Sequence, residues 1–384
     1  MTSLTIIVSA YNRASCLNLL LKSLAALKCS QNIDLVISID NKGTKEVNEL
    51  AHMFNWHLGD KKVIIHEEKK GLINHFIWVG DQTQIYEHVL FLEDDMYVSP
   101  QILNFALQAI PKYENDDRVA GCSLYNPPFT LSGLIFDKLP DSYDNFFYQH
   151  PYWGNIWFKN KWAKFKDYLT TYKLNETILP IAVQKWKSGS FKRIFIQYLI
   201  ETGRTMVFPR DSVLTNMGTP GLHGGGNVDF VQVPIEPTQV SREFRLSSID
   251  ESLARYDAFE EIDVAIIKKF NKKLSDYDFL IDTKLNRNYY DSEFILTTRS
   301  VNNSIQTYSM SLKPYENNVI MQYQGTGISF CRLNDLVENN RDRSRLIWHT
   351  VRSHCPVDNK KYIPFEIERV LKVILHKIFR IENK

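Results

Sequence analysis

The chain has 384 residues, a length that predicts one large α/β unit or two domains. Hydrophobic residues make up 44% and charged residues 23%, which excludes a mostly disordered, collagen-like or coiled-coil protein. The net charge is only +2, so the composition lacks the strong basic excess of nucleic-acid-binding proteins, and no nucleic-acid partner is expected.

Short apolar runs alternate with longer amphipathic stretches in the first half of the chain, from residue 4 to about residue 207. This alternation is typical of a parallel α/β sheet, whose buried strands are nearly continuous in apolar residues. The pattern therefore predicts a Rossmann-like domain. The predicted strands are residues 4–9, 35–40, 63–66, 88–93 and 118–123. The predicted helices between them are residues 15–27, 72–82 and 100–113.

The pattern changes after a stretch with several glycines and prolines at residues 215–227. A charged segment follows, and then an amphipathic helix is predicted near residues 258–274. The next segments alternate apolar and polar side chains, which predicts a small antiparallel sheet of about five strands. These segments are residues 279–282, 293–298, 306–312, 318–323 and 327–333. The predicted fold class is α/β, with a first domain at 1–235 and a mixed helical and β-rich C-terminal module at 236–384.

Three consecutive acids, Glu93, Asp94 and Asp95, end the apolar strand in LFLEDDMYVSP. The carboxyl edge of a parallel strand faces the crevice in which ligands of α/β sheets bind. Clustered carboxylates are costly unless a cation neutralises them, and their hard oxygens suit Mg²⁺ or Mn²⁺ bridging phosphates. The alternative to a cation site is that these three acids form a solvated turn with no functional role.

Two other strand ends carry side chains for the same edge. The first strand ends in SAYNR and the second in SIDN, which places Ser9, Tyr11, Arg13 and Asp40 there. A carboxylate can accept hydrogen bonds from a base or a ribose hydroxyl, and an arginine can offset phosphate charge. The combination predicts a site for a nucleoside diphosphate.

The ordered segments TIIVSAYNR, SID, KKGLINH and EDD resemble the family-2-type glycosyltransferases of the GT-A fold. Farther along, PYWGNIWFKNKW and TMVFPRDSVLTNMGTPGLHGG resemble the second half of the catalytic domain in bacterial polysaccharide enzymes. The resemblance covers about residues 3–235, and the ordered set is more specific than any one segment.

This resemblance implies transfer of a hexosyl or N-acetylhexosaminyl group from a nucleotide-sugar, expected to be a UDP-sugar. The implied acceptor is a saccharide or a lipid-linked saccharide in bacterial capsule, O-antigen or exopolysaccharide assembly. The C-terminal module would then bind the acceptor, form a homo-oligomer or dock on a membrane. The alternative outside catalysis is a carbohydrate-binding or scaffold protein on a decayed transferase fold.

The resemblance also implies contacts to the nucleotide. Tyr11 and Asp40 are expected at the base and the ribose. Arg13 and Lys70 are expected near the diphosphate. Ser9, at the end of the first strand, completes this predicted binding set.

A divalent metal, Mn²⁺ or Mg²⁺, is implied in the same way. Asp95, in the DxD-like run EDD, corresponds to the direct metal ligand. Glu93 and Asp94 are expected to contact the sugar, the ribose or metal-bound water. His223, in GLHGG, matches a position that closes over the metal or the diphosphate.

The sequence departs from the family pattern at the position of the base that activates the acceptor hydroxyl. An inverting enzyme needs a carboxylate or histidine within hydrogen-bond reach of that hydroxyl. Related enzymes carry it before a Trp-containing helix, whereas Gln184 and Lys185 stand before Trp186 here. Whether transfer inverts or retains the anomeric configuration is therefore left open. The nearby candidates, each with an ordinary surface role as its alternative, are Asp144, His150 and Glu176.

Tryptophans in the segment PYWGNIWFKNKW offer flat surfaces that can stack on a sugar. Trp157 and Trp162 have helical spacing, which favours core packing. Trp153 is the predicted sugar contact, because the adjacent Gly154 lets backbone and ring approach a ligand closely.

The sequence lacks the motifs that two other enzyme classes require. The run HGGG imitates an esterase oxyanion loop, but no GxSxG nucleophile elbow accompanies it. A dinucleotide-dependent oxidoreductase needs GxGxxG after the first strand, where SAYNRAS stands instead.

The cellular location is expected to be cytoplasmic. The five cysteines are scattered without paired spacing, and the N-terminal apolar stretch is too short for a signal peptide. Residues 363–384 predict an amphipathic helix with basic residues on its polar face. Such a helix can lie on an anionic membrane or pack on the protein itself, so peripheral contact with the inner face of the cell membrane is a further expectation.

Overall fold

The computed structural model describes residues 3–187, 189–218 and 229–354. The chain divides into two compact units, Met1–Leu336 and Val337–Lys384. In the described part of the second unit, the helix α11 spans Asp342–His354. The predicted amphipathic helix at 363–384 and the predicted metal-site residue His223 lie outside the described residues.

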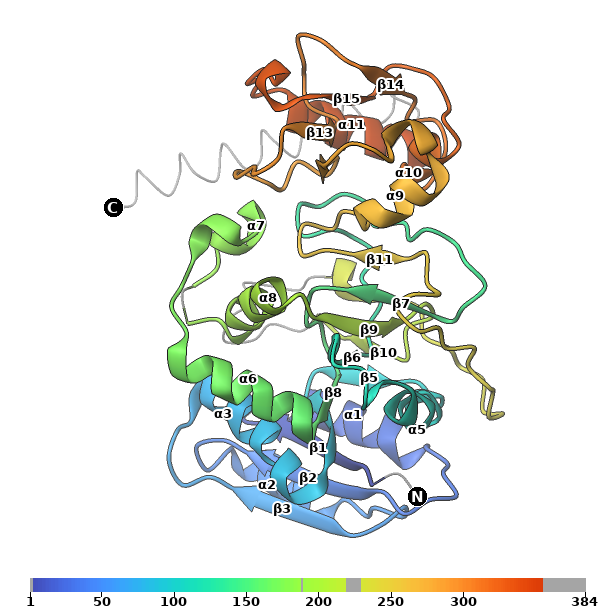
Figure 1. Cartoon of the computed structure of the whole chain (residues 1–384). Coiled ribbons are helices and arrows are strands. Elements are labelled where there is room, and N and C mark those ends of the chain that lie inside the picture. The colour runs from blue at the N-terminus through green and yellow to red at the C-terminus, as the bar shows by residue number, and fades with distance from the viewer. Residues whose placement is uncertain (1–2, 188, 219–228, 355–384) are drawn as a thin grey trace, which may run out of the picture. The chain divides into compact units, whose positions relative to one another are not determined.

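A mixed sheet of nine strands forms the centre of the first unit, counted over the described residues, in the order β11-β7-β9-β6-β8-β4-β1-β2-β3 (Figure 1). The β4, β1, β2 and β3 strands run parallel to one another, whereas β8 is antiparallel to both β4 and β6. The strands are β1 Thr5–Ala10, β2 Asp34–Ile39, β3 Lys61–Ile65, β4 His88–Glu93, β6 Val119–Ser123, β7 Asn145–Tyr148, β8 Asn155–Phe158, β9 Thr205–Pro209 and β11 Arg255–Tyr256.

Helices cover both faces of this sheet, with α1 and α5 on one side and α3, α6 and α8 on the other (Figure 1). The predicted α/β fold is therefore confirmed, and each predicted strand and helix of the first half overlaps an observed one. The helices are α1 Ala14–Ala25, α2 Lys45–Met53, α3 Gly71–Asp81, α4 Thr83–Tyr86, α5 Ile102–Tyr113, α6 Lys159–Thr171, α7 Ile181–Gln184 and α8 Phe191–Thr202. A separate pair of short strands, β5 Met96–Val98 and β10 Leu214–Asn216, is antiparallel.

The segment after residue 235 packs on the large sheet before it enters the smaller one. Ser99 Oγ donates to the Glu236 carbonyl, and Tyr113 Oη donates to the Ser247 carbonyl at 2.7 Å. The β11 strand then pairs with β7. Residues 1–336 thus form one compact unit, within which the division at residue 235 stays a prediction.

A second sheet of four strands, counted over the described residues, has the order β12-β13-β15-β14. Its pairs β13–β15 and β15–β14 are antiparallel as predicted, but β12 and β13 run parallel. The strands are β12 Phe279–Asp282, β13 Phe294–Thr297, β14 Gln306–Tyr308 and β15 Ile328–Arg332.

One strand predicted for this module was wrong, and the predicted helix is shorter than expected. The expected strand at 318–323 overlaps the helix α10, Glu316–Ile320, because the Asn318 amide donates to the Leu312 and Tyr315 carbonyls and closes a local turn. The expected helix near 258–274 is reduced to α9, Val264–Phe270, which Asp263 caps by accepting from the Ala265 amide.

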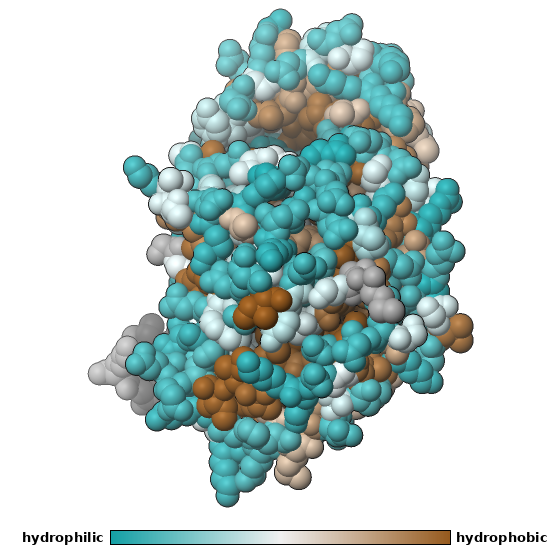
Figure 2. Space-filling view, turned by 60° about the horizontal axis from the view of Figure 1, so that its bottom comes forward, coloured by the Kyte–Doolittle hydropathy of each residue, from teal (hydrophilic) through white to brown (hydrophobic). Residues whose placement is uncertain are grey.

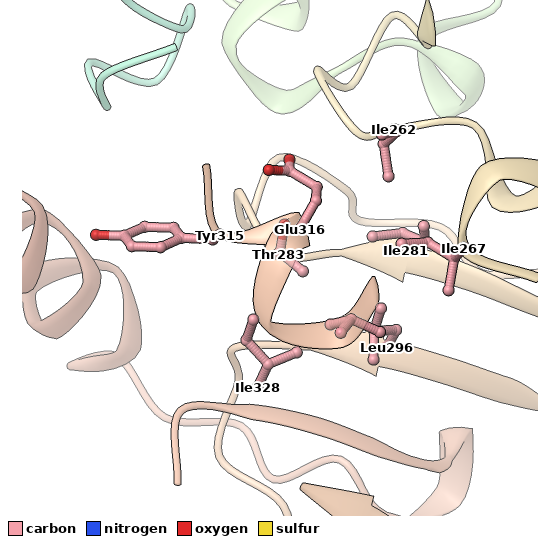
Figure 3. Close-up of a pocket in the computed structure, with 9 residues that line it drawn as sticks. Ile262, Ile267, Ile281, Thr283, Leu296, Tyr315, Glu316 and Ile328 are labelled. Atoms are coloured by element: carbon pink, nitrogen blue, oxygen red, sulfur yellow. The ribbon is translucent and has the colours of Figure 1, made fainter. Parts of the chain in front are cut away.

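The surface seen in Figure 2 is mainly hydrophilic, with patches of apolar side chains between the polar ones. A buried ion pair lies beside the small sheet, where Lys284 Nζ, after β12, is 2.8 Å from Glu316 Oε1 of α10. Figure 3 shows Glu316 and Thr283 beside a cavity that is otherwise lined mostly by apolar side chains. Its volume of about 10 Å³ is close to that of one water molecule, so this cavity is too small for a substrate.

Close packing at Gly80 fixes the position of α3 against α6. A Cβ atom on Gly80 would lie 2.0 Å from the Trp162 ring. The Trp162 indole donates to Asp81 Oδ1 at 2.8 Å, which holds the ring in this place. Because α3 begins beside the candidate site, this contact also helps to position the site.

We predict that Gly80→Ala lowers the free energy of unfolding by about 1–3 kcal/mol, because the added methyl overpacks the helix contact. Chemical denaturation measures the effect. Asn74→Ala, at an exposed position of the same helix, is the control and should change stability by no more than about 0.5 kcal/mol. Equal stability of Gly80→Ala and wild type would contradict this packing argument.

Candidate functional site

The predicted strand ends meet at one edge of the large sheet. In the parallel register, Ser9 of β1 lies beside Ser38 of β2 and beside Glu93 of β4. Asp40 follows β2 directly, and Asp94 and Asp95 follow β4. The structure therefore brings the expected nucleotide and metal residues from three strands to the same edge.

Arg13 links the acidic run to the first strand. Its guanidinium pairs with Asp94 and, at 2.8 Å, with Asp95 Oδ2. Burial opposes the charge of the guanidinium, but the two carboxylates outweigh it and raise the pKa of Arg13. The arginine expected near a diphosphate thus neutralises the acids in this structure.

Despite this pairing, two of the acids have raised pKa values, because their ionised forms are disfavoured. Burial, together with the charge of Asp95, raises the pKa of Glu93 to about 7. Burial also raises the pKa of Asp94 to about 6, although Arg13 opposes the shift. Asp95 Oδ1 is buried without a hydrogen-bond partner among the described residues.

The chemistry of these residues fits a hard divalent cation. An unpartnered buried carboxylate oxygen is a suitable ligand, and Mg²⁺ is often held by one or two carboxylates plus substrate phosphates. Within residues 3–187, 189–218 and 229–354, no three His, Cys, Asp or Glu side chains converge to hold a metal ion alone. A cation at Asp95 would therefore depend on phosphate and water for its other ligands.

Asp40 makes two hydrogen bonds to the backbone at the start of α3. Its Oδ1 accepts from the Lys70 amide at 2.7 Å, and its Oδ2 accepts from the Gly71 amide at 3.0 Å. Gly71 has φ +70°, a backbone conformation that glycine adopts without a Cβ penalty. The carboxylate thus fixes the turn that places Lys70 at the same edge. The sequence pattern did not reveal this structural role.

Two histidines beneath this edge were also missed by the sequence. Ser38 Oγ lies 2.9 Å from His66 Nε2 and 2.7 Å from His75 Nε2. Burial lowers the pKa of His75 to about 4, so its ring is neutral near pH 7. The three side chains form a polar link between β2 and α3.

A cavity of about 540 Å³ adjoins the acidic edge. Glu93 and Lys192 are its charged lining residues among those that the structure describes, and residues 127–131 form one wall. Aromatic side chains from several segments supply most of the remaining lining. They are Phe76, Tyr125, Tyr152, Trp153, Trp186, Phe191 and Phe230.

His150 lines this cavity and is almost completely buried. Its ring stacks on Tyr148, with centroids 5.5 Å apart, and neither ring nitrogen has a hydrogen-bond partner among the described residues. Burial and then the charge of Lys192 lower the pKa of His150 well below its usual value. The imidazole is therefore neutral near pH 7, and its lowered pKa makes it a weaker base than an ordinary histidine.

The other two base candidates lie outside the cavity lining. Asp144 accepts from the Arg242 guanidinium and from the Arg245 amide, each at 2.7 Å. Glu176 accepts from Arg193 at 2.6 Å. Both carboxylates thus have cationic or backbone partners of their own.

Trp153 lines the cavity, as expected for a sugar contact, and Gly154 supports its placement. Gly154 has φ +65°, and a Cβ atom there would lie 1.9 Å from Leu214. The Lys192 ammonium lies 4.5 Å from the centre of the Trp153 ring. Trp157 and Trp162 are buried, which confirms that they pack in the core.

Lys192 was missed by the sequence analysis, although it lies in the first turn of α8. Burial lowers its pKa, while Glu93 and Asp95 oppose that shift. The only sequence signal was a glycine- and serine-containing stretch, SGS, before an amphipathic helix.

Comparison with known proteins finds a match to the first part of the chain. Residues 5–167 match the family model described as glycosyl transferase family 2. No curated protein matches the sequence.

Several solved structures show partial similarity. S. aureus TarS 1–349 in complex with UDP is 17% identical over 55% of this chain and 59% of that chain, with a TM-score of 0.37. S. aureus TarS 1–349 alone is 16% identical over 56% of this chain and 61% of that chain, with a TM-score of 0.32. The mannosyltransferase PcManGT from Pyrobaculum calidifontis, in complex with GDP-Man and Mn2+, is 13% identical over 44% of this chain and 46% of that chain, with a TM-score of 0.31. The matched part thus spans about three-fifths of the TarS 1–349 chain or less.

We predict that Asp40→Ala lowers the free energy of unfolding by about 1–3 kcal/mol, because two backbone amides lose their acceptor. The variant should also bind UDP more weakly, since the turn at Lys70 loosens and the predicted ribose contact is lost. Chemical denaturation and calorimetry measure the two effects. Asp60→Ala, which removes an exposed carboxylate, is the control. Wild-type stability and UDP affinity in Asp40→Ala would place the nucleotide elsewhere.

Proposed function

We propose that this protein is a metal-dependent glycosyltransferase that moves a sugar from a nucleotide-sugar, expected to be a UDP-sugar, to a saccharide acceptor. The observation that carries the proposal is the convergence of three strand ends beside a substrate-sized cavity within a family 2 domain. The neighbours bound to UDP, UDP-GlcNAc and GDP-Man are consistent with a nucleotide-sugar donor. A hexosyl or N-acetylhexosaminyl group fits a cavity of about 540 Å³.

In the proposed donor complex, Tyr11 and Asp40 contact the base and the ribose, while Lys70 and Arg13 approach the diphosphate. Asp95 holds Mn²⁺ or Mg²⁺, which when bound would neutralise charge that grows on the leaving diphosphate. Ser9 and Asp94 border the nucleotide at the strand ends, and Glu93 faces the sugar from the cavity wall. These roles rest on the positions of the side chains and on the family resemblance.

The proposed base is His150, because it is the candidate that lines the cavity and neither of its ring nitrogens has a hydrogen-bond partner among the described residues. The acceptor oxygen would form a bond to the anomeric carbon, and the bond from that carbon to the diphosphate would break. The hydroxyl proton would pass to His150. Trp153 and Gly154 would border the sugar during this step.

The remaining expectations concern the setting of the reaction. The part of the chain that the structure describes contains no helix long and apolar enough to cross a membrane. A cytoplasmic location, a lipid-linked acceptor, peripheral membrane contact through residues 363–384 and a homo-oligomer stay predictions. A role in bacterial surface-polysaccharide assembly likewise stays a proposal drawn from the resemblance.

Metal dependence through Asp95 is the direct test of the proposal. UDP-sugars and GDP-mannose are screened by thermal stabilisation with and without Mn²⁺, since a ligand at 100 times its dissociation constant adds about 2.7 kcal/mol. We expect one donor to raise the thermal stability of the protein only when Mn²⁺ is present. We expect Asp95→Asn to release the nucleotide product from that donor at least about 100-fold more slowly than wild type. Asp60→Asn should behave as wild type.

Undiminished turnover of Asp95→Asn, or full activity in excess EDTA, would contradict the metal assignment. Donor binding without transfer or hydrolysis would instead support the carbohydrate-binding alternative.

His150 is tested by separating binding from chemistry. We expect His150→Gln to bind UDP with wild-type affinity in calorimetry but to lower the transfer rate by about 100-fold or more. The same measurements on Asp144→Asn and Glu176→Gln compare the three base candidates. A wild-type transfer rate in His150→Gln would remove it from the mechanism.

A further inference from the structure

Glu260 lies on the tight turn between β11 and α9, far along the chain from the family 2 domain. Its side chain is fully buried and its Oε1 accepts from the Leu131 amide. The Tyr148 hydroxyl donates to the same oxygen at 3.4 Å, and the Asn286 amide donates to Oε2 at 3.4 Å. One carboxyl group thus joins a cavity wall, β7 and the segment that follows β12.

The backbone at this position is unfavourable for glutamate. Glu260 has φ +70°, a region that side chains with a Cβ rarely adopt. The turn is held by two backbone hydrogen bonds, from the Asp257 amide to the Glu261 carbonyl and from the Glu260 amide to the Asp257 carbonyl, at 2.9 and 3.0 Å. Such strain persists where the surrounding structure requires the residue, so the side-chain contacts give a reason for glutamate here.

Two of the three contacts lead directly to the cavity. Leu131 ends the wall formed by residues 127–131, and that wall is otherwise closed by local bonds such as the Phe136 amide to the Pro128 carbonyl. Tyr148 stacks on His150, which lines the same cavity. Glu260 therefore connects the wall to the end of β7, which His150 follows by two residues.

We propose that Glu260 is a positioning residue of the substrate cavity, which fixes the wall at 127–131 and the Tyr148–His150 ring stack relative to each other. Residues beyond the predicted boundary at 235 thereby belong to the substrate site of the chain. The inference rests on the proposed function only for the role of the cavity. The connection between the wall at 127–131 and the Tyr148–His150 ring stack rests on the hydrogen bonds of Glu260.

The environment of Glu260 favours a neutral side chain that forms hydrogen bonds over a charged one that forms an ion pair. Glu261 and Lys284 lie on its C-terminal side, and Lys138 interacts with it from the first half of the chain. Burial raises the pKa of Glu260 to about 8, although the Leu131 amide opposes the shift. At pH 7 the group is therefore mostly neutral, and glutamine is its closest substitute.

The test compares Glu260→Ala, Glu260→Gly and Glu260→Gln in the full-length chain by hydrogen exchange with mass spectrometry at pH 7. We expect amides of residues 127–136 to exchange at least tenfold faster in the Ala and Gly variants, and at the wild-type rate in Glu260→Gln. The Gly variant also relieves the strained backbone, so it separates the lost carboxyl group from the strain.

The matched control is Glu261→Gln, a neighbouring buried carboxylate that bonds to Thr283 and the Lys284 amide rather than to the cavity wall. It should leave exchange of residues 127–136 unchanged. Unchanged exchange in Glu260→Ala and Glu260→Gly would overturn the inference. Faster exchange spread equally over β1 and β4 would assign Glu260 to general stability and overturn it as well.

UDP binding with Mn²⁺ is measured on the same variants, because it separates this inference from the proposed function. We expect the dissociation constant to stay within twofold of wild type, since the strand-end site does not contact Glu260. Failure of UDP to bind any variant, wild type included, would count against the proposed function alone. A loss of UDP binding confined to Glu260→Ala and Glu260→Gly would overturn a role restricted to the cavity.

Discussion

Mutual repulsion among Glu93, Asp94 and Asp95 is the constraint on which the rest of the site depends. A buried strand ends in three carboxylates, and such a group is costly unless positive charge is close. Arg13 supplies that charge from the loop between β1 and α1, and Lys192 adds a cation from α8. Cations of the protein thus partly neutralise the acids at the carboxyl edge of the sheet.

Hydrogen bonds and packing contacts within the protein hold the side chains at this edge in place. Asp40 is tied to the backbone at Lys70 and Gly71, and Ser38 joins two histidines below it. Gly80 lets α3 approach Trp162 closely, so the helix cannot shift outward without losing that contact. A preorganised edge of this kind reduces the ordering that binding would otherwise require.

The parts of the site that the sequence predicted are those with a local signal. Apolar runs followed by polar residues located β1, β2 and β4, and their parallel order placed Asp40 and Asp95 at one edge. The cavity has no such signal. Leu131 and Glu260 are 129 residues apart, and nothing in either local pattern indicates that they meet. The helix at 316–320 was missed because the turn beside it is closed by the Asn318 side chain, whose bonds to the Leu312 and Tyr315 carbonyls have no signal in the hydrophobic pattern.

In the proposed function, the acceptor side departs from the family pattern while the donor side follows it, and the arrangement of the cavity gives a reason for this difference. The proposed donor side consists of neighbouring strand ends, which the parallel sheet places together whatever follows in the chain. The proposed acceptor side is lined by residues 127–131, His150 and the start of α8, so its geometry depends on distant contacts. The proposed base His150 thus lines a part of the cavity that the strand-end motif does not specify.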